Sequence, residues 1–125
     1  MKTFKMFLCE QECVLTESEV YEMASIQPED SGLKQLIFVS TKDYVGSSHW
    51  ARIKVSNVYG TFSKEDNFVV SVDKNPKILA GKSKYTKDQL NDIFDWVKLN
   101  YEVLMKYWKN EFNSTKDFYL NLKKI

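Results

Sequence analysis

The sequence lacks the residues that would mark it as a secreted or metal-binding protein. Among 125 residues it has only two cysteines, Cys9 and Cys13, and a single histidine, His49. Two thiols four residues apart would need two more ligands to hold zinc, so we interpret them as free thiols and expect no metal and no cofactor. No run of 18 apolar residues is present, so no membrane span is expected. Residues 1–9 lack the apolar core of a signal peptide. These absences predict a cytoplasmic protein.

An excess of charge of one sign is also absent. The 18 Lys and Arg residues nearly balance the 17 Asp and Glu residues, which leaves a net charge of +1. There is therefore no overall basic field to attract nucleic acid, although local basic patches remain possible. The sequence also lacks a glycine-rich phosphate loop, a paired-histidine metal motif and a nucleophile elbow. An enzyme is thus the less favoured interpretation. The length fits one domain with a real core, over residues 1–125.

Short apolar runs predict a sheet in the first two thirds of the chain. The segment Arg52–Ser56 alternates strictly, which predicts a strand with Ile53 and Val55 inward and with Arg52 and Lys54 on a solvated face. Before the sheet we expect an extended arm and a short helix ended by Pro28, followed by a loop. The arm spans residues 1–14, the helix 17–25 and the loop 27–32, and the other expected strands span residues 36–39, 68–72 and 77–80.

Proline and glycine are missing from Lys87 to Phe112, where a long helix is predicted. Thr86 and Gln89 form a capping box at its start. Apolar residues then follow at steps of three and four, and they are Leu90, Ile93, Phe94, Val97, Tyr101, Leu104, Met105 and Trp108. A final helix over residues 115–124 begins with the capping pattern of Ser114 and Asp117.

Strands followed by helices predict an α+β fold. We expect a small antiparallel sheet packed on one long C-terminal helix, with a short N-terminal helix and a short final helix. The N-terminal arm and helix occupy residues 1–32, the sheet residues 33–80 and the helices residues 86–125.

One polar segment has the residue types that hold an anion. His49, Arg52 and Lys54 lie close together on a loop and on the strand that leaves it. A guanidinium offers a planar fork to phosphate or carboxylate, an ammonium offers a compact charge, and histidine titrates near neutral pH. Lys82 adds positive charge before the long helix, whose free N–H groups also attract anions. We predict that these four residues bind an anionic ligand, either a nucleotide or a nucleic-acid backbone, and we assign no catalytic residue.

Other interpretations stay open for the same segment. A strand with Arg and Lys on its outer face is most often simply solvated. A small metal-independent ribonuclease-like toxin would use His49 as the base, with Arg52 and Lys54 stabilising the developing charge. A protein–protein adaptor, such as a phage inhibitor of a host defence, would use the N-terminal segment or exposed aromatic side chains at Tyr44, Trp50 and Tyr59.

Residues 36–125 also carry a recognisable order of motifs. Phe38-Val39-Ser40 is followed by His49 and then by Arg52-Ile53-Lys54-Val55-Ser56, and later segments complete the pattern. They are Ile78-Leu79-Ala80-Gly81, Trp96-Val97-Lys98-Leu99-Asn100, Tyr107-Trp108 and Leu122-Lys123-Lys124-Ile125. This pattern resembles a group of small bacterial and phage-borne proteins of unknown function. The resemblance implies a compact α+β domain of prokaryotic or phage origin and brings no established activity or ligand. Members often carry Gly-Pro between the histidine and the arginine, where this chain has Trp50-Ala51.

Overall fold

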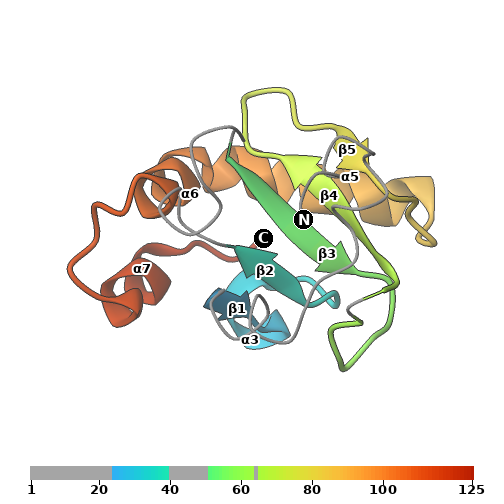
Figure 1. Cartoon of the computed structure of the whole chain (residues 1–125), viewed down its shortest axis with the longest axis horizontal. Coiled ribbons are helices and arrows are strands. Elements are labelled where there is room, and N and C mark those ends of the chain that lie inside the picture. The colour runs from blue at the N-terminus through green and yellow to red at the C-terminus, as the bar shows by residue number, and fades with distance from the viewer. Residues whose placement is uncertain (1–23, 40–50, 64) are drawn as a thin grey trace, which may run out of the picture.

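A computed structural model of the chain describes residues 24–39, 51–63 and 65–125 (Figure 1). The arm predicted for residues 1–14, most of the helix predicted for residues 17–25, and Cys9, Cys13 and His49 lie outside these ranges. The described elements are β1 (Ala24–Ile26), α3 (Pro28–Ser31), β2 (Ile37–Val39), β3 (Arg52–Ser56), β4 (Asn67–Ser71), β5 (Ile78–Ala80), α5 (Lys87–Leu99), α6 (Tyr101–Trp108) and α7 (Thr115–Asn121).

The five strands form one antiparallel sheet in which each strand pairs with the next along the chain, in the order β1-β2-β3-β4-β5. Antiparallel neighbours need no crossover connection, so strands that follow one another along the chain can pair directly. The bounds predicted for β3 match the structure, those of β2 and β5 differ by one residue at the start, and those of β4 differ by one residue at each end. With helices following the sheet, the predicted α+β class is confirmed.

The C-terminal helices α5, α6 and α7 pack on one face of the sheet. The pairing aligns Ile26, Ile37, Val55 and Phe68 across four strands, and Ala24, Val39, Ile53, Val70 and Ile78 form a second row on the same face. These rows form one hydrophobic core with Ile93, Trp96, Val97, Leu104, Met105 and Phe118 from the three C-terminal helices. Figure 1 shows α5 and α6 running behind the sheet. Ile53 and Val55 are therefore inward, as predicted.

The opposite face of the sheet is buried as well, which corrects one prediction. Lys54 lies on this face in a row with Phe38, Val69 and Ala80, and it is only 7% exposed. Phe62, from the β3–β4 connection, packs on Phe38 with ring centroids 4.2 Å apart. The expected solvated position of Lys54 is therefore wrong. Alternation shows which side chains share a face but not whether that face is covered, and a lysine stem can be buried like an apolar chain.

The long helical segment begins as predicted. The Thr86 side chain accepts a hydrogen bond from the Gln89 backbone N–H at 3.2 Å, and the Gln89 side chain accepts one from the Thr86 backbone N–H at 2.9 Å. This is the reciprocal capping box that the sequence indicates. The predicted helix therefore has the expected start, and the acidic Asp88 in its first turn suits the helix dipole.

Two features of that helix differ from the prediction. The structure divides it at Asn100, whose backbone angles, φ −106° and ψ 19°, interrupt the helix between α5 and α6. An asparagine side chain competes with the helical backbone for hydrogen bonds, and here it binds a second segment of the chain. The helix also ends at Trp108 rather than Phe112, because Asn110 adopts a left-handed conformation, with φ 61°.

The smaller helices also differ in part from the predictions. Residues 27–32 were expected to form a loop, but Pro28–Ser31 form α3, with proline at its first position and Gly32 at its end in a left-handed conformation. Ala24 and Ser25, expected at the end of a helix, lie in β1 instead because they pair with β2. The final helix begins after Ser114 as predicted and ends at Asn121.

Two structural features are absent from the described residues. None of the helices in those ranges is long and apolar enough to cross a membrane. In the same part of the chain, no three His, Cys, Asp or Glu side chains gather in a way that could hold a metal ion.

Candidate functional site

The four residues predicted to bind an anion occupy different environments. His49 lies outside the described residues. Arg52 is half-buried at the start of β3 and Lys54 is buried in its middle, and both side chains have interaction partners. Lys82 follows β5 and is exposed. Because Lys54 pairs with Val69 and Val69 with Ala80, two strand spacings, roughly 10 Å, separate Lys54 from β5. The structure thus places Arg52 and Lys54 on one face of β3 and Lys82 beyond another strand.

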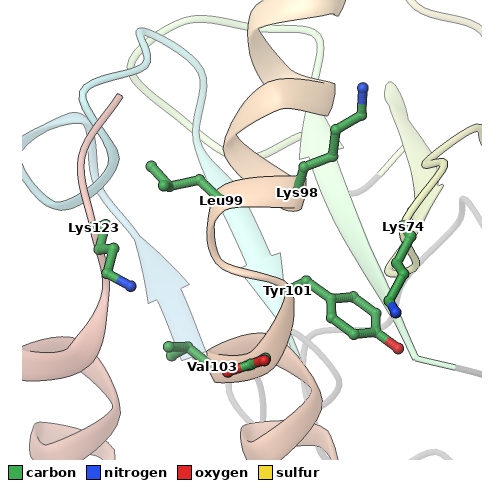
Figure 2. A pocket seen from close by; sticks show the side chains of 7 residues that line it. Lys74, Lys98, Leu99, Tyr101, Val103 and Lys123 are labelled. Atoms are coloured by element: carbon green, nitrogen blue, oxygen red, sulfur yellow. The ribbon is translucent and has the colours of Figure 1, made fainter.

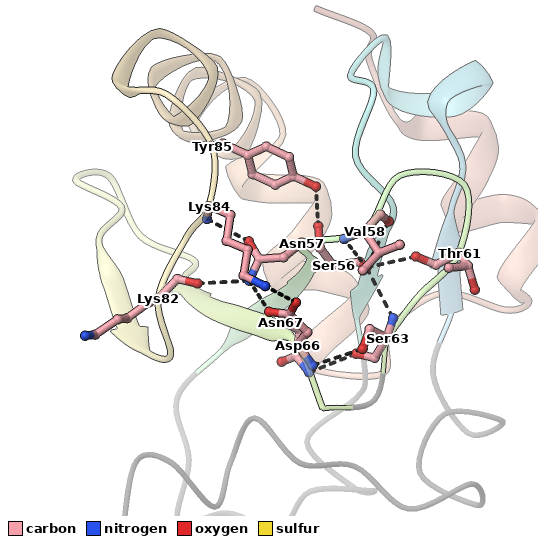
Figure 3. Close-up of polar contacts among 10 residues, drawn as sticks. All are labelled: Ser56, Asn57, Val58, Thr61, Ser63, Asp66, Asn67, Lys82, Lys84 and Tyr85. Carbon is pink, nitrogen blue, oxygen red and sulfur yellow. Dashed lines mark hydrogen bonds and ion pairs between the residues drawn. The ribbon is translucent and has the colours of Figure 1, made fainter.

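Lys82 borders a network of polar side chains at the end of the sheet (Figure 3). We call this network the sheet-end cluster, and it consists of Ser56, Asn57, Asp66, Lys84 and Tyr85. The Asn57 amide donates to the Asp66 carboxylate at 3.0 Å and to the Lys82 carbonyl at 2.9 Å, and it accepts from the Lys84 backbone N–H at 2.9 Å. The Lys82 side chain points away from the cluster in Figure 3. The cluster therefore joins the β3–β4 connection to the β5–α5 connection.

The charged and phenolic groups of the sheet-end cluster strengthen this junction. The Lys84 ammonium binds the Asp66 carboxylate, and hydrogen bonds from Lys84 and Asn57 lower the pKa of Asp66. The Tyr85 hydroxyl donates to the Ser56 carbonyl. Burial raises the pKa of Tyr85 to about 12, and the nearby Tyr59 and Asp66 add to that shift. These contacts hold the segment just before α5 in place, and we interpret the cluster as structural.

The raised pKa of Tyr85 predicts an alkaline loss of stability. Its folded-state pKa of about 12 lies above its ordinary value of 10.0, so folding favours the protonated phenol. The stability that this group contributes is complete below pH 10 and is lost as the pH rises from 10 towards 12. Urea denaturation of the wild type and of Tyr85→Phe measures this loss between roughly pH 8 and pH 11.5. The free energy of unfolding should fall less steeply with rising pH in the variant, because phenylalanine has no phenol to ionise. Parallel declines in the two proteins would contradict the assignment.

A separate hollow lies where α5 meets α6 (Figure 2). We call it the junction pocket. Its volume is about 340 Å³, and its walls come from the helix junction, the β4–β5 turn and the C-terminal segment that follows α7. Its lining residues are Lys74, Lys98, Leu99, Tyr101, Glu102, Val103 and Lys123. Three ammonium groups, one carboxylate, one phenol and two aliphatic side chains thus line one small space.

The Asn100 side chain binds the C-terminal segment that forms one wall of the junction pocket and contains Lys123. Its buried side-chain amide donates to the Trp96 carbonyl at 3.1 Å and to the Lys123 carbonyl at 3.0 Å. Its carbonyl oxygen accepts the Lys123 backbone N–H at 2.7 Å. Further along, the Ile125 N–H donates to the Ser31 carbonyl at 2.9 Å. The division of the helix and the position of Lys123 therefore have one cause, the side chain of Asn100.

The charges of the junction pocket favour a negative ligand. Across residues 24–39, 51–63 and 65–125, the ammonium groups of Lys74 and Lys123 have no acceptor. Lys98 lies 3.9 Å from Asp95, but both side chains are largely exposed, and such a pair contributes little. Figure 2 shows Lys74 beside the hydroxyl end of Tyr101, the Lys123 amine on the other side of the junction, and Lys98 directed away along α5.

The sequence did not indicate the junction pocket. Its three lysines span residues 74 to 123 and only the fold brings them together. One signal was present, however. Trp96, Asn100 and Leu104 recur at steps of four, and all three are buried, so a polar residue interrupts an apolar stripe. A buried polar side chain must find hydrogen-bond partners, and Asn100 finds them in the C-terminal segment.

The fold and this pocket define a small α+β protein with a five-stranded antiparallel meander and a hollow at a helix junction. No protein-family model, curated protein or solved structure gives a significant match to the chain. The resemblance of residues 36–125 to small bacterial and phage-borne proteins therefore stays a prediction.

Proposed function

We propose that this protein is a small binding module that holds an anionic ligand in the junction pocket. The observation that supports the proposal is the pair of ammonium groups, on Lys74 and Lys123, that line the pocket without an acceptor in the described residues. Lysine is a compact, strongly charged donor that suits phosphate and carboxylate oxygens. The volume of about 340 Å³ is near the lower end for ligand pockets and fits a small molecule or a single unit of a polymer.

The structure favours the junction pocket over the strand first predicted as the anion site. Lys54 is buried and has a partner, and Arg52 is half-buried and also has one. Lys74, Lys98 and Lys123 are exposed and come from three separate segments that surround one hollow. The proposed class of ligand is the one expected from the sequence, whereas the proposed site is different. The ribonuclease-like alternative depends on His49, outside the described ranges, and stays a prediction.

Calorimetric titration with pyrophosphate tests the proposal directly. Pyrophosphate should bind the wild type, and the double variant Lys74→Ala/Lys123→Ala should bind it roughly five- to thirtyfold more weakly, because each exposed contact is worth about 0.5–1 kcal/mol. Binding should also weaken as salt is raised, since the charges are exposed. Absence of binding to the wild type at millimolar pyrophosphate would reject the proposal.

The chain offers a matched control for this double variant. Lys77 lies in the same β4–β5 connection as Lys74, and Lys124 is the neighbour of Lys123. Neither Lys77 nor Lys124 lines the pocket. The variant Lys77→Ala/Lys124→Ala therefore removes the same charge from the same two segments and should bind pyrophosphate almost as well as the wild type. An equal loss in both double variants would mean that net charge, and not the pocket, controls binding.

A further inference from the structure

We infer that the ligand of the junction pocket is a nucleoside phosphate unit, with its base against Tyr101 and its phosphate held by Lys74. This inference rests on the proposed function and narrows the class of anion. It depends on three kinds of group that meet in the pocket, namely cations, an aromatic ring and an unpaired carboxylate.

A cation and an aromatic ring lie together in the junction pocket. Tyr101 is the first residue of α6, directly after the break at Asn100, and its half-buried ring lines the pocket. Figure 2 shows the Lys74 amine beside the hydroxyl end of this ring, so a phosphate bound by Lys74 lies near the edge of an aromatic side chain. Single-stranded and free nucleotides are commonly held by this combination of a positive group and an aromatic platform.

Two aliphatic side chains line the junction pocket together with this ring. Leu99 is 44% exposed although it is a large hydrophobic residue, and Val103 is half-buried beside it in the pocket wall. A bare inorganic anion would leave these side chains facing water. A ligand with a planar, weakly polar part covers them, and a nucleobase is such a part.

Glu102 brings a carboxylate to the junction pocket. In the part of the chain that the structure describes, its carboxylate has neither a cation nor a hydrogen-bond donor. This carboxylate disfavours a second anionic group of the ligand beside it, as in a dicarboxylate. It accepts well from sugar hydroxyls or from an exocyclic amino group, and acidic side chains bind ribose hydroxyls in this way in dinucleotide-binding folds. Each part of a nucleotide thus has a matching group in the pocket.

The source of the nucleotide is either a free mononucleotide or a single-stranded nucleic acid, since both carry the same base and phosphate. A free mononucleotide has a terminal phosphate with extra charge and leaves the ends of the pocket empty. A strand continues past the pocket in both directions. Titration of AMP beside a single-stranded oligo(A) of about eight residues assigns the source, because a strand site should bind the oligomer more tightly per molecule and with stronger salt dependence.

The decisive comparison is AMP against ribose 5-phosphate, by calorimetric titration of the full chain. AMP should bind about tenfold more tightly, because stacking of a base on an aromatic side chain contributes that order of affinity. The variant Tyr101→Leu, which keeps an apolar side chain without the ring, should bind AMP and ribose 5-phosphate with nearly equal affinity, so that the preference measured on the wild type is lost. Circular dichroism and the pyrophosphate titration together show whether the variant is folded.

Failure of this inference is distinct from failure of the proposed function. Equal affinity for AMP and ribose 5-phosphate, with pyrophosphate still bound, would overturn the nucleotide assignment and leave the anion site in place. Weakening of AMP and pyrophosphate to the same extent in a folded Tyr101→Leu variant would also overturn it. If neither AMP nor pyrophosphate binds the wild type, both proposals fall together.

Discussion

Replacing Trp96 with alanine should lower the free energy of unfolding by about 3–5 kcal/mol. Trp96 is fully buried on α5, where it belongs to the single core formed by the helices and the inner face of the sheet. Alanine would remove most of the buried ring and leave a cavity that its neighbours fill only in part, so both lost transfer energy and lost packing contribute. Urea denaturation monitored by far-UV circular dichroism measures the change.

A control substitution at an exposed position shows whether truncation of any large helical side chain destabilises the protein. Leu120, on α7, is 73% exposed, so Leu120→Ala should change the free energy of unfolding by no more than about 0.5 kcal/mol. A loss below about 1 kcal/mol for Trp96→Ala would mean that α5 does not face the core as described.

The variant Asn100→Ala should have the second largest effect, a loss of about 2–3 kcal/mol in the free energy of unfolding. The Asn100 side chain makes three hydrogen bonds, one to the Trp96 carbonyl and two to the backbone of Lys123. Alanine removes these bonds and leaves partly buried backbone groups of Lys123 without partners, which costs more than the bonds themselves are worth. Release of Lys123 should also weaken pyrophosphate binding, because that lysine lines the junction pocket.

Asn121 provides a matched control for this prediction. Its side chain donates to the Asp117 carbonyl four residues earlier at 2.8 Å, as Asn100 donates to Trp96, but it is exposed and makes no hydrogen bond to a second segment of the described chain. Asn121→Ala should therefore cost no more than about 0.5 kcal/mol. Hydrogen exchange adds a local readout, since the Lys123 amide should lose protection in Asn100→Ala. Similar costs for the two asparagine variants would contradict the proposed clamp.

The elements with strong local signals could be predicted from the sequence. The alternation in Arg52–Ser56 gave the bounds of β3, and the Thr86–Gln89 pair gave the start of α5, because both depend only on residues a few positions apart. The burial of Ile53 and of the apolar stripe on α5 follows from the same periodicity. Interactions between residues close in the chain determine these features, so the sequence alone is enough to predict them.

Features that depend on distant residues could not be predicted in the same way. Lys54 looked solvated because nothing in β3 itself shows that its outer face is covered. The break at Asn100 depends on a partner 23 residues later in the chain, and α3 forms within a segment whose composition is typical of a loop. The junction pocket combines the β4–β5 turn, a helix junction and the C-terminal segment, so local patterns indicate at most the buried Asn100 and not the pocket itself.

Backbone amide chemical-shift mapping of the ¹⁵N-labelled protein during titration with AMP tests the central claim most directly. The account predicts that the largest shifts cluster at Lys74, Tyr101 and Lys123, the residues around the junction pocket, and that they saturate together. Shifts centred on Arg52 and Lys54 with none at the helix junction, or no shifts at millimolar AMP, would contradict it.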